Sequence, residues 1–173
     1  MDRFVRIRLV ILLPSLLCAA LVWIVQLTAK VEVSHDFLVV RFLDVGQGDA
    51  VHIVTPDGYE MLVDGGATAG VLRELAQGQS FFDREIDVLV ATHPDTDHIG
   101  GLVDVLGRYD VDIIIETEAQ SESPAALAYA KAAALEGAEI KIAQAGQKIK
   151  LGASTTIEIY SPQGDTTNWE NNS

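Results

Sequence analysis

A cluster of metal-ligating side chains directly after an apolar run is the feature that most constrains the fold. The run, Ile86 to Ala91, is typical of a strand buried on both faces. The segment Thr92-His93-Pro94-Asp95-Thr96-Asp97-His98 follows it, and the pattern Ile99 to Leu106 then predicts a helix. The chain therefore has to place this cluster on a loop that joins a buried strand to a helix.

The composition of the cluster favours a metal site. Imidazole and carboxylate ligands suit zinc, manganese or iron(II). Alternation along an extended loop would project His93, Asp95 and Asp97 to one side, and His98 would join them from the start of the helix. Aspartate at such a position also caps helix N-termini, but two histidines and two aspartates together favour metal binding.

The rest of the pattern predicts an α/β fold. Three β-branched and aromatic runs separated by short turns indicate an antiparallel meander, in which His52 is expected on the solvent face. Buried strands and helices then alternate, which indicates a sheet covered by helices. The expected strands are 37–44, 50–54, 59–63, 86–91, 111–115, 140–142, 149–151 and 155–160, and the expected helices are 71–75, 99–106 and 124–135, the last starting at Pro124 and ending before Gly137.

Two glycine-containing turns precede the cluster. Asp44 and the sequence Gly46-Gln47-Gly48-Asp49 separate the first two strands, and Asp64-Gly65-Gly66 ends the third. Such sequences serve equally well as plain turns, in which aspartate caps local amides, or as the lining of a pocket. The sequence leaves both interpretations open.

The N-terminus predicts a membrane segment. Leu9 to Ala29 contains no charged residue, and as a helix it would be about 31 Å long, enough to cross a hydrocarbon core of about 30 Å. Arg3, Arg6 and Arg8 precede the run, so the positive-inside rule places the remainder of the chain outside the cell membrane. We expect a single-pass anchor over 1–30, a linker over 31–37 and a domain over 38–173; a cleaved signal peptide, which would make the protein secreted, is the alternative.

Charge and cysteine content exclude other classes. Residues 30–173 contain 24 acidic and nine basic side chains, a net charge of −15, which excludes a simple basic nucleic-acid binder. Cys18 is the only cysteine, so an internal disulfide and a cysteine-based zinc site are excluded.

Three motifs in order carry a resemblance to a known family. The segment Thr92 to Gly101 resembles the metal motif of the metallo-β-lactamase superfamily. The segments Phe42-Leu43-Asp44-Val45-Gly46-Gln47-Gly48-Asp49-Ala50 and Leu62-Val63-Asp64-Gly65-Gly66 resemble the exported hydrolase domain of the ComEC-type DNA-uptake proteins and their stand-alone relatives. The resemblance covers roughly residues 38 to 173.

The resemblance implies a four-layer αβ/βα sandwich with two divalent metal ions, zinc or manganese, at the sheet edges. His93 and Asp95 would serve one metal, and Asp97 and His98 the other, with Asp97 also taking part in catalysis. Asp95 stands where the superfamily usually has histidine, and a carboxylate there makes manganese more plausible beside zinc. Asp64 would orient the ligand loop, and the implied pocket lining is Asp44, Gln47, Asp49, Gly65 and Gly66.

The implied function is a membrane-anchored, metal-dependent hydrolase. It would act outside the membrane on a phosphodiester, of DNA or of the cell envelope, by attack of a metal-bound hydroxide. Its expected partners are membrane lipid, through the N-terminal helix, and this substrate; the sequence identifies no protein partner. One candidate span is too few for the multi-helix channel of ComEC-type proteins, so DNA transport is not expected.

One departure from the family opens an alternative. The remaining metal ligands of the family come from the second half of its fold, and this sequence has no histidine after His98. We therefore expect only the first half of the sandwich. The alternative function is a catalytically inactive metal-binding or interaction module.

Overall fold

A computed structural model describes residues 12, 14–15, 17–21, 36–78 and 83–162. The chain separates into two units, residues 1–33 and 34–173. Most of the expected membrane segment, 9–29, lies outside the described residues, and among those described there is no helix with the length and apolar character needed to cross a membrane.

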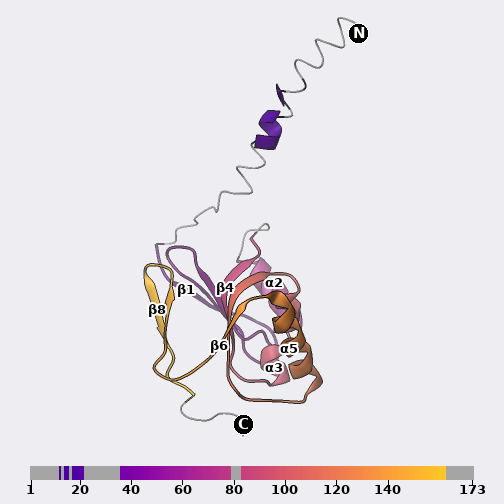
Figure 1. The fold of residues 1–173 in the computed structure, drawn as a ribbon, viewed down its shortest axis with the longest axis vertical. Helices are drawn as coiled ribbons and strands as arrows, with labels where there is room; N and C mark the ends of the chain where they lie inside the picture. Colours follow the sequence, from indigo (N-terminus) through magenta and orange to yellow (C-terminus); the bar gives the residue numbers. More distant parts are fainter. Residues whose placement is uncertain (1–11, 13, 16, 22–35, 79–82, 163–173) are drawn as a thin grey trace, which may run out of the picture. The chain divides into compact units, whose positions relative to one another are not determined.

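A six-stranded mixed sheet forms the centre of this unit (Figure 1). The first three strands make the expected antiparallel meander, and the next three join it in parallel, in the order β1-β2-β3-β4-β5-β6. β-branched residues dominate these strands, as a half-buried or fully buried pleated surface favours. The strands are β1 (Val39–Phe42), β2 (Val51–Val54), β3 (Glu60–Val63), β4 (Glu85–Ala91), β5 (Asp110–Glu116) and β6 (Glu139–Ile142).

Helices cover one face of the sheet (Figure 1). They are α2 (Gly70–Ala76), α3 (Thr96–Ile99), α4 (Leu102–Leu106) and α5 (Pro124–Glu136). The single helix expected over 99–106 is in fact two short helices, because Gly100 and Gly101 separate α3 from α4. Their apolar side chains meet those of the sheet in one buried cluster that includes Leu62, Leu89 and Leu102, all of them fully buried.

The sequence signals at both ends of α5 are confirmed. Ser123 caps the helix, its Oγ accepting a hydrogen bond of 3.1 Å from the amide of Ala126, and Pro124 occupies the first turn. Gly137 ends the helix with a φ of 83°, a left-handed conformation that glycine adopts without a steric penalty. The buried face consists of Ala126, Tyr129 and Ala133, so this helix approaches the sheet with mostly small side chains.

A two-stranded sheet packs on the other face (Figure 1). Strands β7 (Lys148–Leu151) and β8 (Thr155–Glu158) pair antiparallel, and Leu151 packs against Met61 and Val88 of the large sheet. The described residues thus form three layers: helices, the mixed sheet and this hairpin. An apolar cavity of about 350 Å³ lies between the hairpin and the mixed sheet.

Asp57 joins the hairpin to the turn between β2 and β3. Its carboxylate accepts hydrogen bonds from the amide of Ala153 and, at 2.9 Å, from the hydroxyl of Ser154. The bond from the Ala153 amide, followed by one from the Thr55 hydroxyl, holds the pKa of Asp57 below its ordinary value. The ionised form makes this contact, so the contact is complete above the ordinary aspartate pKa of about 4 and weakens in strong acid.

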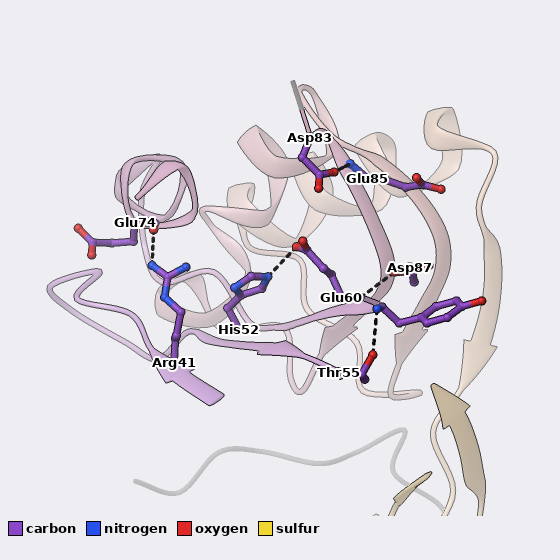
Figure 2. A network of polar contacts seen from close by, with 9 residues as sticks. Arg41, His52, Thr55, Glu60, Glu74, Asp83, Glu85 and Asp87 are labelled. Atoms are coloured by element: carbon purple, nitrogen blue, oxygen red, sulfur yellow. Dashed lines mark hydrogen bonds and ion pairs between the residues drawn. The ribbon is translucent and has the colours of Figure 1, made fainter. Parts of the chain in front are cut away.

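The expectation for His52 was wrong. This side chain is fully buried, and its Nε2 lies 2.8 Å from Oε2 of Glu60, which is also buried (Figure 2). Arg41, its partner across the β1–β2 ladder, donates from Nη2 to the carbonyl of Glu74 at 2.7 Å. α2 covers this side of the meander. The side chains of His52 and Arg41 therefore form hydrogen bonds within the protein instead of with water.

We predict that His52→Ala lowers the free energy of unfolding by about 2–4 kcal/mol, because it removes a buried ring and its bond to a buried carboxylate. Urea denaturation followed by circular dichroism measures the change. Lys131→Ala, on the exposed face of α5, is the control and should change stability by less than about 0.5 kcal/mol. Equal stability of the two variants would contradict a stabilising role for the buried pair.

Candidate metal centre

The candidate centre lies where two neighbouring parallel strands end. β3 and β4 pair in parallel, with Val63 opposite Val90. Asp64 therefore follows β3 at the same edge of the sheet at which Thr92 and His93 follow β4. Asp64 is 3% exposed, and its φ of 55° is a left-handed conformation that few residues other than glycine adopt. Strain of this kind occurs mostly at functional sites.

The carboxylate of Asp64 holds the ligand loop. Its Oδ1 accepts the backbone amide of Thr92 at 2.9 Å, and its Oδ2 accepts the hydroxyl of Thr92 at 2.6 Å. The same Oδ2 lies 2.8 Å from Nδ1 of His98. Since an ionised carboxylate only accepts hydrogen bonds, Nδ1 of His98 carries the proton. The other ring nitrogen, Nε2, then has the lone pair that a metal needs.

Through the hydroxyl of Thr92, the carboxylate of Asp64 also orients the ring of His93. The hydroxyl proton of Thr92 is donated to Asp64, so its oxygen acts as an acceptor towards Nδ1 of His93, 2.9 Å away. Nδ1 of His93 therefore donates as well, and in the neutral ring its Nε2 has the lone pair. One buried carboxylate thus sets the tautomer of both imidazoles, directly for His98 and through a hydroxyl for His93.

Three side chains converge closely enough to hold one metal ion. The ligand atoms of Asp64, His93 and His98 all lie within 4.8 Å of one another, and the two imidazole centroids are 3.9 Å apart with the rings tilted by 48°. Because Asp64 already accepts three hydrogen bonds, we interpret it as the residue that orients the ligands. The donor set fits zinc, and two carboxylates on the same loop make it compatible with manganese.

The two predicted aspartate ligands have different positions. Oδ2 of Asp95 lies 3.5 Å from Nε2 of His93, so this carboxylate flanks the candidate centre. Asp97 is half-buried in the first turn of α3, and neither aspartate belongs to the converging groups found among the described residues. Metal binding by Asp95 and Asp97, and catalysis by Asp97, stay predictions.

Gly48, Gly100 and Gly101 allow the surrounding loops to pack closely against backbone carbonyl groups, and Gly65 and Gly66 lie against the side chains of Leu102 and Val45. A Cβ on Gly48 would lie within covalent distance of the carbonyl oxygen of Asp97, and one on Gly101 would overlap the carbonyl of Gly65. Hydrogen bonds run across the same contacts, from the amide of Gly65 to the carbonyl of His98 at 2.8 Å and from Gly101 to Gly66 at 2.9 Å. Glycine at these positions therefore permits the close approach of the loops.

The remaining predicted pocket residues lie on the loop between β1 and β2. Asp44, Gln47 and Asp49 are exposed, and the carbonyl of Asp49 accepts the amide of Gly66 at 3.0 Å. This backbone bond joins the loop to the Asp64 turn. A role of their side chains in a pocket stays a prediction.

A second acidic group occurs at the opposite edge of the sheet. Glu85 and Asp87 lie near the start of β4 and Asp112 near the start of β5, and one carboxylate oxygen of each lies within 4.8 Å of the others. This group contains no imidazole, and exposed carboxylates often gather without a metal. The group of Asp64, His93 and His98, at the carboxyl ends of β3 and β4, is therefore the stronger candidate for a metal site.

Sequence reasoning missed Thr92 as a functional residue. A threonine before the first ligand looks like the last residue of a β strand, and only the register of β3 against β4 brings its hydroxyl to Asp64. The only indication in the sequence was that Thr92 stands between the end of the predicted strand and the first histidine of the cluster.

Comparison with known proteins identifies the family. A model of the metallo-β-lactamase superfamily matches residues 43–159, more than half of the chain. The chain therefore belongs to the metallo-β-lactamase superfamily, whose members are in general metal-dependent hydrolases. No curated protein matches the chain significantly.

Solved structures of metallo-β-lactamases also resemble the chain. MEM-A1, a subclass B3 enzyme isolated from a soil metagenome library, is 19% identical with a TM-score of 0.46, over 68% of this chain and 48% of its own. A HARLDQ-motif mutant of the enzyme from Cronobacter sakazakii is 21% identical with a TM-score of 0.45, over 65% and 47%. The Rm3 metallo-β-lactamase is 15% identical with a TM-score of 0.47, over 69% and 47%. The chain spans about half the length of these structures.

We predict that Thr92→Val weakens zinc binding by about 10- to 100-fold, because it removes the hydroxyl that orients His93. Competition with a chromophoric chelator measures the affinity. Thr92→Ser keeps the hydroxyl and should bind zinc nearly as the unaltered protein does. Thr96→Val, at the exposed first residue of α3, is the matched control. An equal loss of zinc affinity in both valine variants would contradict the role of the Thr92 hydroxyl in orienting His93.

Proposed function

We propose that the protein is a membrane-anchored, metal-dependent phosphodiester hydrolase that acts outside the membrane and is related to the ComEC-type hydrolase domains. The observation that carries the proposal is the control of two imidazoles by the single buried carboxylate of Asp64. Such preorganisation suits a site that must hold a metal in one geometry. Membership of the superfamily supports hydrolysis as the reaction class.

His93 and His98 would hold metal through Nε2, with the carboxylates of Asp95 and Asp97 completing the donor set for two divalent ions. A bound divalent ion supplies Lewis-acid polarisation of a phosphoryl oxygen and lowers the pKa of a bound water. Asp64 and Thr92 hold both rings by their Nδ1 atoms, which leaves Nε2 of each ring as the atom that would face the metal. In the proposed reaction the carboxylate of Asp97, in the first turn of α3, would accept a proton.

A phosphodiester is the substrate class that best suits the motifs and the expected location. The net charge of −15 over residues 30–173 disfavours tight binding of long DNA by phosphate neutralisation. Contact with the substrate would therefore concentrate at the metal site. Both a DNA phosphodiester and a phosphodiester of the cell envelope meet this requirement.

We also propose the complete family architecture, a four-layer αβ/βα sandwich. The apolar surface between the mixed sheet and the β7–β8 hairpin supports it, because a sandwich packs the faces of two sheets together. The three described layers would be its first part.

The test of the function is hydrolysis of bis(p-nitrophenyl) phosphate by protein loaded with zinc or manganese. We expect His93→Ala and His98→Ala each to lower turnover by at least about a hundredfold, because each removes a metal ligand. A chelator should abolish activity, and added metal should restore it. Asp112→Asn, which removes an exposed carboxylate at the opposite edge of the sheet, is the control and should leave turnover unchanged.

The outcomes separate the alternatives. Unchanged turnover in both histidine variants would refute the proposed centre. Tight metal binding without hydrolysis of bis(p-nitrophenyl) phosphate, single-stranded DNA or a small carboxylic ester would indicate a metal-binding module instead. Cleavage of DNA compared with the small phosphodiester at several salt concentrations separates the two substrate sources, since only DNA binding depends steeply on salt.

The proposed anchor is the apolar segment 9–29, preceded by three arginines. We predict that the expressed protein stays in the membrane fraction after alkaline carbonate extraction, and that deletion of residues 1–30 releases it to the soluble fraction. Immunoblotting of both fractions measures the distribution. A soluble protein that has lost its N-terminal residues would show a cleaved signal peptide and exclude the anchor.

A further inference from the structure

A pocket of about 260 Å³ opens beside the candidate metal centre. It lies between the ends of β4 and β5, the loop that follows β5, and α5, and His93 forms part of its wall. A group bound there would be directly adjacent to a phosphoryl centre held at the imidazoles. The polar residues that line it are His93, Glu116, Thr117, Gln120, Ser121 and Tyr129.

Small side chains on α5 create the space. Ala126 and Ala130 line the pocket one turn apart, and Ala91 and Ala119 line it from β4 and the loop. Leucine at any of these positions would occupy much of the volume. A pocket of 260 Å³ is slightly below the usual range of about 300–1,000 Å³ for ligand sites, so it suits one ring or one short chain.

Glu116 determines the chemical character of the pocket. Its Oε2 accepts the hydroxyl of Tyr129 at 3.2 Å, and burial followed by the charge of Glu116 raises the pKa of that hydroxyl. Tyr129 therefore stays a donor to Glu116 at all ordinary pH values. A carboxylate can accept about four hydrogen bonds in total, so this half-buried group retains acceptor capacity for a ligand.

The residues that line the pocket disfavour a ligand with an anionic group in addition to the phosphate at the metal centre. Among the described residues around the pocket, none is lysine or arginine, and the one charged carboxylate repels phosphate. Hydroxyl and amide groups of Thr117, Gln120 and Ser121 can donate to or accept from a neutral ligand. Several acceptors around a small volume match the hydroxyls of a sugar or a polyol.

We propose that this pocket binds the sugar or polyol group esterified to the phosphate that is cleaved. The inference rests on the proposed hydrolase function and adds the part of the substrate that the enzyme recognises. A terminal deoxyribose of DNA, which keeps one free hydroxyl, and the glycerol or ribitol of an envelope polymer share this chemistry.

The experiment compares p-nitrophenyl phosphodiesters that differ only in the second alcohol. The methyl group of the methanol ester is too small to fill the pocket. Thymidine and glycerol present free hydroxyl groups to it, whereas choline presents a cationic group instead of hydroxyls. We expect KM for the thymidine or the glycerol ester to be about tenfold or more below that of the methyl ester, the effect of one or two hydrogen bonds to a partly buried carboxylate.

Two variants test the pocket itself. Ala130→Leu, on an exposed position of α5, should raise KM for the hydroxylated ester towards that of the methyl ester. Glu116→Gln, which removes the charge and keeps the shape, should raise the same KM several-fold. Ala128→Leu is exposed on the same helix outside the pocket, and as the matched control it should change nothing.

The outcomes distinguish this inference from the proposed function. Hydrolysis of all esters with equal KM, no effect of Ala130→Leu, or a preference for the choline ester would overturn the sugar pocket and leave the hydrolase intact. Hydrolysis of none would refute the hydrolase. In that case, the binding affinities of thymidine 5′-phosphate and glycerol phosphate are compared with that of methyl phosphate. Tighter binding of the first two that is lost in Ala130→Leu would support the pocket, and equal binding of all three would overturn it.

Discussion

The hydrogen bonds of the Asp64 carboxylate are the interaction on which the candidate centre depends. A buried carboxylate is stable only when strong donors satisfy it, and here the donors are the backbone of Thr92, its hydroxyl and the ring of His98. The same bonds that stabilise the charge also fix the loop after β4. The energetic requirement of one buried group therefore determines the geometry of the two imidazole rings of the candidate centre.

This arrangement is possible because the surrounding loops have almost no side chains between them. Gly65 and Gly66 meet Gly100 and Gly101, and Gly48 lies against the backbone of Asp97. A Cβ at most of these positions would overlap a carbonyl group or a neighbouring side chain. The glycine pairs thus allow the ends of β1, β3 and β4 to reach a common point, and α3 to begin immediately after the ligand loop.

The fold also separates two chemical environments. The carboxyl ends of β3, β4 and β5 carry imidazoles, a positioning carboxylate and a pocket with hydroxyl and amide groups. The opposite edge carries the carboxylate group of Glu85, Asp87 and Asp112. Under the proposed function, the net charge of −15 over residues 30–173 disfavours phosphodiester binding away from a metal, so the centre and its adjoining pocket together would account for recognition.

The sequence alone determined most of the strands, the caps of α5 and the location of the ligand cluster. These features depend on local patterns: apolar alternation, Pro124 and Gly137 at the ends of a helix, and imidazole and carboxylate side chains close together in the chain. The side of the sheet on which His52 lies, the break between α3 and α4, and the partners of Asp64 depended on packing between segments far apart in the sequence. Only the tertiary structure decided them, because the parallel register of β3 and β4 brings Asp64 to Thr92, 28 residues away, and no local pattern encodes that register.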